Sequence, residues 1–232
     1  MYSKSAFSEI DTTLLIRMII HDLDAPLSVI NRIMDRIRIG RFDPNSETQM
    51  RIVKSSTSAL DRIRRMLQDM QEVASGREIK VRLEDIQLEQ LGDLIAQEFI
   101  PVAAAESQRL SYTCQDIIIQ TDLDLFMRIA INFLMNALHH NTIGNPIIMK
   151  LTGDRNGKYS LIVQNTGAII PENHLEDIFH PGIQLELKIS RKWRGHGLGL
   201  AFCRLAAQAL GGTVKAENLP DQSGVRFSFC VG

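Results

Sequence analysis

The sequence lacks the features that tie a chain to a membrane, a nucleic acid or a disulfide framework. Its net charge of -1 gives no electrostatic basis for binding nucleic acid or an anionic membrane. The three cysteines, Cys114, Cys203 and Cys230, form no CxxC pair, which argues against a zinc site and fits a reducing compartment. No apolar run approaches the length of a bilayer span. We therefore expect a cytoplasmic protein that inserts no segment into a membrane and binds no nucleic acid.

The length and the change of pattern along the chain predict two domains. A chain of 232 residues suits one large domain or two small ones, each with its own core. Ser75-Gly76-Arg77-Glu78 is typical of a hinge, because the apolar pattern differs on its two sides. We expect a helical domain over residues 1–76 and a mixed domain over residues 77–232. The predicted fold class of the whole chain is α+β.

The first domain is predicted to be an antiparallel helical hairpin. Two stretches, separated by a break at residues 40–46, carry apolar residues at alternating spacings of four and three. The first stretch comprises Ile16, Ile20, Leu23, Leu27, Ile30, Met34 and Ile37, and the second comprises Val53, Ser56, Leu60, Ile63, Leu67, Met70 and Ala74. A lone hairpin cannot fully bury one apolar seam per helix. We therefore predict a homodimer in which two hairpins form a four-helix bundle.

The second domain is predicted to be an α/β sandwich. Helical spacing covers residues 88–105, with a stop or a kink near Pro101, and also residues 123–140 and 198–210. Short strands are expected at residues 110–114, 116–120, 146–152, 159–164, 213–217 and 225–231. Helices mixed with mostly antiparallel strands favour two layers around one core.

Two short motifs carry potential chemistry. His21 lies on the flank of the first seam, and Asp22 follows it; a carboxylate can fix the tautomer of an attacking imidazole. The same pair is also typical of an ordinary surface histidine. Gly195, Gly197 and Gly199 open a helix, where free backbone N–H groups can hold phosphate. Such a glycine-rich turn is also typical of a plain connection.

In combination, five motifs resemble the boxes of sensor histidine kinases. The residues from His21 to Leu27 resemble the H box, in which a phosphorylatable histidine is followed by an acid and by Pro-Leu. The other boxes are Asn132 to His140 (N box), Asn165 to Pro171 (first glycine box), Ile178 to Pro181 (F box) and Gly195 to Leu200 (second glycine box). Their order and spacing also fit. The resemblance implies a dimerisation and phosphotransfer hairpin followed by an ATP-binding domain of the histidine-kinase ATPase type.

The resemblance implies a role for each matching residue. His21 would be the phosphoacceptor, and Asp22 would orient or deprotonate its imidazole. Asn136 would hold Mg²⁺, a reasonable role for a neutral oxygen ligand. The remaining ATP-binding candidates are Asn132, His139, His140, Asn165, Gly167, Gly195, His196, Gly197, Leu198 and Gly199. Residues 184–194, with Lys188, Arg191, Lys192 and Arg194, would form a basic lid over ATP, although a solvated charged loop is an equal alternative.

Four positions depart from the family pattern. Asn165 stands where an aspartate usually accepts a hydrogen bond from the adenine amino group. Ile169 replaces a glycine of the first glycine box, and His139 replaces a lysine or arginine. Ala25 lacks the polar atom that places water for dephosphorylation, so we expect poor phosphatase activity.

The predicted function is that of a two-component histidine kinase that uses ATP and Mg²⁺ and passes phosphate from His21 to an aspartate of a response-regulator receiver domain. One alternative is a phosphotransfer adaptor with a vestigial ATP site. Another is a pseudokinase that regulates a partner kinase through the hairpin. No sensor domain is recognised in the 232 residues, so the input is expected from a separate sensor protein or from a region outside this sequence.

Overall fold

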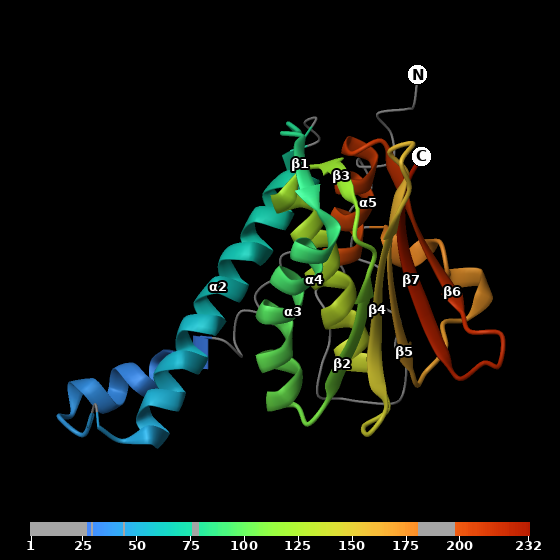
Figure 1. Cartoon of the computed structure of the whole chain (residues 1–232). Coiled ribbons are helices and arrows are strands. Elements are labelled where there is room, and N and C mark those ends of the chain that lie inside the picture. Colours follow the sequence, from blue (N-terminus) through green and yellow to red (C-terminus); the bar gives the residue numbers. More distant parts are fainter. Residues whose placement is uncertain (1–26, 29, 44, 76–78, 181–197) are drawn as a thin grey trace.

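The computed structural model describes residues 27–28, 30–43, 45–75, 79–180 and 198–232. Residues 27–28 and 30–38 are helical, and the chain turns through Gly40, whose φ of +65° suits a residue without a side chain. Helix α2 (Glu47–Ser75) then runs for 29 residues (Figure 1). The second helix of the hairpin and the break before it therefore agree with the sequence prediction.

The described part of the hairpin leaves many large apolar side chains exposed. Met34 and Ile37 lie in its first helix, and Leu60 and Leu67 lie in α2. All four belong to the two seams that the sequence predicts. Exposed apolar residues that recur along a helix favour a partner surface over solvent. The dimer itself stays a prediction.

A five-stranded sheet forms one layer of the chain that follows α2. Its strand order is β2 (Arg109–Cys114), β4 (Pro146–Gly153), β5 (Tyr159–Thr166), β7 (Gly224–Val231) and β6 (Gly212–Asn218). The β2–β4 pair is parallel and the other three pairs are antiparallel. Along β5, side chains alternate between buried and half-buried, as expected when one face covers a core.

A second, two-stranded antiparallel sheet joins β1 (Glu84–Gln87) to β3 (Ile118–Thr121). The sequence predicts β3 but not β1. The four residues Glu84, Asp85, Ile86 and Gln87 include only one residue type that favours strands, so nothing local marks them. Pairing with β3, some 30 residues later, makes this segment a strand.

Helices α3 (Leu88–Ala105), α4 (Leu123–His140) and α5 (Gly199–Ala209) form the other layer (Figure 1). The bounds of α3 and α4 are those predicted, but α3 does not stop at Pro101 and continues to Ala105. Gly211, with a φ of +74°, follows α5 and ends it as expected. Two short 3₁₀ turns, η1 (Glu172–His174) and η2 (Asp177–Phe179), lie between β5 and α5.

The core lies between the sheet and these helices. Phe126 of α4 meets Phe229 of β7 with ring centroids 5.7 Å apart, and Phe133 meets Phe227 at 5.5 Å. All four rings are buried, so they contribute large apolar areas to the core. The predicted α/β sandwich, and with it the α+β fold class, is confirmed. No helix in the described ranges combines the length and apolar character needed to cross a bilayer.

Candidate functional site

The N box occupies the second half of α4 and places its polar side chains along one flank. Asp122 caps the helix, because its Oδ1 accepts a hydrogen bond from the Leu125 N–H at 3.1 Å. Asn132, Asn136 and His139 follow at spacings of four and three, and all three are half-buried. They therefore share the edge of the helix where the buried face meets the accessible one.

The start of α5 lies directly against Asn132. A Cβ placed on Gly199 would come within 2.5 Å of the Asn132 Oδ1. Glycine therefore lets the first turn of α5 approach the N box this closely without a change in the Asn132 side chain. The Leu198 side chain is buried, and its carbonyl accepts from the Phe202 N–H at 2.8 Å. Leu198 is predicted to bind ATP, and because its side chain is buried, only its backbone can face a ligand.

Asn165, near the end of β5, carries a buried acceptor that no donor in the described part of the chain reaches. It is 2% exposed, and its Nδ2 donates weakly to the Thr166 carbonyl at 3.3 Å. Its Oδ1 has no hydrogen-bond partner among the described residues. A buried acceptor left unsatisfied costs about 1–3 kcal/mol. Its position on the inward face of β5, toward the helical layer, suits an acceptor kept for a ligand donor such as the adenine amino group.

Gly167 joins the first glycine box to the end of the N box. Its φ is +136°, and a Cβ at this position would collide with the carbonyl oxygen of His140. The Gly167 N–H donates to the Ser223 carbonyl at 2.7 Å, and the Thr142 N–H donates to the Thr166 carbonyl at 2.8 Å. The backbone at the end of α4 therefore lies against the backbone at the end of β5, with no room for a side chain between them.

A network of side-chain amides fixes this junction, and none of the predicted site residues belongs to it. The Asn141 Oδ1 accepts from the Thr166 N–H at 2.9 Å, and its Nδ2 donates to the Gln108 Oε1 at 2.9 Å. Gln108 is buried and donates to the Leu138 carbonyl at 2.9 Å. Asn145 donates to the Thr166 hydroxyl at 2.9 Å. The one available signal was the pair of asparagines directly after the N box, Asn141 and Asn145.

A second amide holds the chain after the first glycine box. Asn218, at the end of β6, accepts from the Ile170 N–H at 2.9 Å and donates to the Ile170 carbonyl at 2.7 Å. Ile170 is buried, whereas Ile169 remains 37% exposed. The isoleucine that replaces a family glycine therefore keeps much of its side chain accessible next to this fixed backbone.

The protonation of His140 follows from its surroundings. Part of its surface is accessible, but desolvation of the imidazole lowers its pKa below the usual value. His140 is therefore neutral at pH 7, and its attraction to phosphate at that pH is small. Among the described residues, no group of three or more His, Cys, Asp or Glu side chains could hold a metal ion.

The F box lies beside α5. Ile178 and Phe179 are buried, and the guanidinium of Arg204 lies 5.5 Å from the centroid of the Phe179 ring. An Arg204 Nη1 also lies 3.3 Å from the His180 Nε2. These contacts join η2 to the outer side of α5.

Several predicted residues lie outside the described ranges. They are His21, Asp22, Ala25, Gly195, His196, Gly197 and the basic segment 184–194. The structure brings together Asn132 with Gly199 and His140 with Gly167, and it places Asn165 on the face of β5 that meets the helices. The binding roles of these residues stay predictions.

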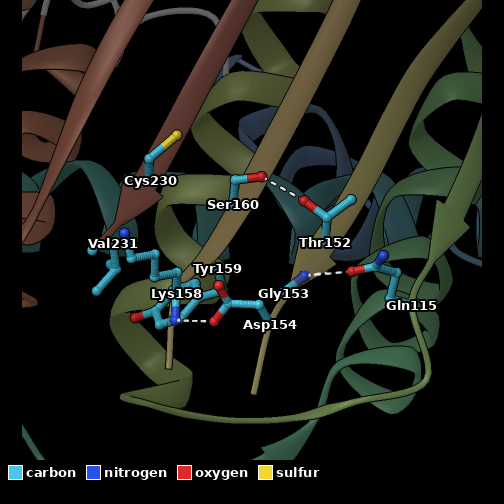
Figure 2. A pocket seen from close by; sticks show the side chains of 10 residues that line it. Gln115, Thr152, Gly153, Asp154, Lys158, Tyr159, Ser160, Cys230 and Val231 are labelled. Carbon is cyan, nitrogen blue, oxygen red and sulfur yellow. Dashed lines mark hydrogen bonds between the residues drawn. The ribbon is translucent and has the colours of Figure 1, made fainter. Parts of the chain in front are cut away.

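A separate hollow of about 360 Å³ lies at the other end of the sheet (Figure 2). Thr152 and Ser160 point into it, with their hydroxyl oxygens 2.7 Å apart. Ser160 differs from Asn165 by an odd number of positions along β5, so the two side chains lie on opposite faces of the sheet. The hollow is therefore distinct from the site between sheet and helices.

Comparisons with known proteins agree with this architecture. Residues 121–232 match the family described as "Histidine kinase-, DNA gyrase B-, and HSP90-like ATPase". The sensor protein CutS of Streptomyces coelicolor is 25% identical over 198 residues, covering 85% of this chain and 47% of CutS. The chain therefore spans about half the length of this curated relative.

Two solved structures share the fold. Full-length ShkA in complex with AMPPNP superposes with a TM-score of 0.65 at 19% identity, over 95% of this chain and 44% of ShkA. Histidine kinase ThkA in complex with the response regulator protein TrrA superposes with a TM-score of 0.60 at 22% identity, over 92% of this chain and 59% of that chain. Both alignments extend over the hairpin as well as the ATPase domain, because each covers more than nine-tenths of this chain.

Proposed function

Because this chain is a sensor histidine kinase transmitter core, with a domain of the histidine kinase-, DNA gyrase B- and HSP90-like ATPase family at residues 121–232, we propose that it binds ATP and phosphorylates its own His21. The chain takes part in two-component signalling as a kinase. We further propose that His21 passes the phosphoryl group to an aspartate of a response-regulator receiver domain.

The observation that carries the proposal is the unsatisfied acceptor of Asn165. Its Oδ1 is buried and lacks a donor within the described protein, which suits the exocyclic amino group of adenine. At the other end of the site, Gly199 lies against Asn132 at the start of α5, where the free N–H groups of the first helical turn would bind a phosphate. The available groups fit an adenine nucleotide at both ends.

Each residue then has a distinct task. Asn165 would bind the base, while the backbone of α5 and the second glycine box would bind the phosphates. Asn136 would supply a neutral oxygen to Mg²⁺, whose remaining ligands would be phosphate oxygens and water. Asp22 would hold the His21 imidazole in one tautomer, so that one ring nitrogen is free to act as the nucleophile. When bound, ATP would supply the γ-phosphoryl group that His21 accepts.

The partners follow from the fold and from the exposed seams. The neighbour ThkA is seen in complex with a response regulator, and the same fold supports a receiver partner for this chain. Met34, Ile37, Leu60 and Leu67 are exposed on the hairpin, which supports a homodimer that covers them. A separate sensor protein, or a region outside this sequence, would supply the signal.

A second candidate is a phosphotransfer adaptor whose ATP site is vestigial. Asn165 is neutral where the family carries a carboxylate, and Ile169 presents an accessible β-branched side chain in place of a glycine. In this role His21 would accept phosphate from one receiver and donate it to another. A pseudokinase that acts on a partner kinase through the hairpin needs neither ATP nor phosphate on His21.

Labelling separates these functions. In the first assay, the full chain is incubated with γ-labelled ATP and Mg²⁺ beside a His21→Ala control. In a separate second assay, the same two proteins are incubated with a receiver domain that carries the labelled phosphate. Acid-labile, alkali-stable label on the wild type alone supports the kinase. Label from the receiver alone, again dependent on His21, supports the adaptor and contradicts the kinase. Absence of label in both assays contradicts both of these proposals and leaves the pseudokinase.

A further inference from the structure

Arg128, on the first half of α4, connects three helices that lie far apart in sequence. Its two terminal nitrogens pair with the two carboxylate oxygens of Glu72 on α2, each at 3.1 Å. Its guanidinium also stacks on the Phe202 ring of α5, with the Cζ 3.7 Å from the ring centroid. One planar cation therefore touches the hairpin on one side and α5 on another.

The Arg128–Glu72 ion pair is partly buried, unlike an ion pair on the open surface. The side chain of Arg128 is 11% exposed and that of Glu72 is 33% exposed. A paired, largely buried arginine is sensitive to the loss of its partner, since the charge would remain without compensation. The third contact, to Asp124 at 3.5 Å, is different, because the Asp124 side chain is 79% exposed and is screened by water.

The stack on Phe202 lies one helical turn from the phosphate end of the site. Arg128 and Asn132 are four residues apart on α4, and Phe202 and Gly199 are three residues apart on α5. Arg128 contacts Phe202, and Asn132 lies against Gly199. The facing sides of α4 and α5 therefore carry both the Arg128–Phe202 contact and, one turn away, the Asn132–Gly199 contact.

We propose that Arg128 is a positioning residue that couples the hairpin helix α2 to the phosphate end of the nucleotide site. By pairing with Glu72, Arg128 keeps its guanidinium over the Phe202 ring, which sets the position of the first turn of α5 against Asn132. A shift of α2 disturbs the stack and moves Gly199, and binding at Gly199 acts back on α2. This proposal rests on the proposed nucleotide site. The effect of α2 on nucleotide binding and the effect of nucleotide binding on α2 are described by the same coupling free energy.

Contacts on the other side of α5 show why a small shift would be transmitted. Arg204 joins the outer side of α5 to Phe179 and His180, while Phe202 is fully buried toward α4. Packed helices move as units because the interior is dense. Displacement at Phe202 therefore moves the whole first turn of α5 rather than one side chain.

A charge-reversal cycle on the full chain tests the coupling. The variants are Glu72→Arg, Arg128→Glu and the double reversal, with Asp124→Asn as the matched control for an exposed partner of Arg128. Two properties are measured: the Kd for Mg²⁺·ADP by calorimetry, and amide hydrogen exchange in residues 63–75 and 199–209. Exchange reports on α2 and α5 without nucleotide, so it still tests the coupling if the wild type binds no ADP, a result that would instead count against the proposed function.

The expected results differ for each variant. Glu72→Arg, which touches no residue of the nucleotide site, raises the Kd by about fivefold or more and increases exchange in both helices. The double reversal recovers part of the loss, limited by repulsion between the new glutamate and Asp124. Asp124→Asn stays within about twofold of the wild type. The proposal is overturned if Glu72→Arg changes exchange in α2 alone, if it leaves ADP binding unchanged in a protein that binds ADP, or if the double reversal is no better than either single variant.

Discussion

The two ends of the candidate nucleotide site are built in different ways. At the base end, the backbone of Gly167 lies against the backbone of His140, and the Asn141 side-chain amide accepts from the neighbouring Thr166 N–H. At the phosphate end, Gly199 lies against a side chain, that of Asn132. Backbone cannot yield without moving its whole element, whereas a side chain can rotate. The base end should therefore tolerate change poorly, and the phosphate end should adapt.

Gly167→Ala gives the largest expected effect. The new Cβ would collide with the His140 carbonyl oxygen, and a φ of +136° is strained for any L side chain. We expect a loss of about 3 kcal/mol or more in the free energy of unfolding, measured by urea denaturation. The control is Gly144→Ala, where φ is also positive, at +99°, but where the added Cβ would meet no atom of the described residues within 4 Å apart from its own chain neighbours. Equal losses at both positions would show that strain, and not contact between the two backbones, sets the cost.

Asn141→Ala tests the amide network of the same end. The substitution leaves the Thr166 N–H and the Gln108 amide oxygen without their partner. A fully buried unsatisfied group costs about 1–3 kcal/mol, and because both of these bonds are only part-buried we expect a loss of about 2 kcal/mol in total. The matched control is Asn156→Ala, in an exposed turn where the Asn156 backbone, not its side chain, donates to Asp154. A loss at Asn141 no larger than at Asn156 would contradict the network.

Gly199→Ala tests the phosphate end and should cost less. The added Cβ meets the Asn132 Oδ1, the far end of a side chain that can rotate away. Alanine also favours a helix over glycine by up to about 1 kcal/mol, which offsets part of the collision. We expect the free energy of unfolding to change by less than about 1 kcal/mol while the Kd for Mg²⁺·ADP rises, because Asn132 is displaced. A loss as large as that of Gly167→Ala would remove the distinction between the two ends.

Much of the fold was predictable from sequence, because helix α4 and strands β4 and β5 have strong local periodicity and clear turn residues between them. The juxtaposed pairs Asn132–Gly199 and His140–Gly167 come from motifs that the sequence analysis identified. The supporting contacts were not predictable. Gln108 and Asn141 are separated by 33 residues, and Glu72 and Arg128 by 56, so no local pattern marks them. Strand β1 depends in the same way on a distant partner.

Asn165→Ala separates binding from stability at the base end. The substitution removes a buried acceptor that no donor of the described residues reaches, so the free protein should lose little stability or gain up to about 1 kcal/mol. The affinity for ADP should fall by about tenfold, in line with one lost buried hydrogen bond. The control is Ser160→Ala, on the opposite face of β5, which should leave the Kd unchanged. Unchanged ADP binding in Asn165→Ala would contradict the assignment of Asn165 to the base.

The smallest expected effect is the pH dependence at the same end, through His140. Desolvation lowers the pKa of His140 in the folded protein. Below the unfolded pKa of about 6.5, the unfolded chain therefore binds a proton at His140 while the folded chain leaves the imidazole neutral. Stability is therefore complete above this pH and declines as the pH falls toward the lower folded pKa. Because His140 is partly accessible, water reduces the penalty and the slope should be shallow. His140→Gln removes the titrating ring, and its denaturation midpoint should fall less than that of the wild type between pH 7 and pH 5.5. If the denaturation midpoint of the two proteins fell equally between pH 7 and pH 5.5, His140 would not be the source of the acid sensitivity.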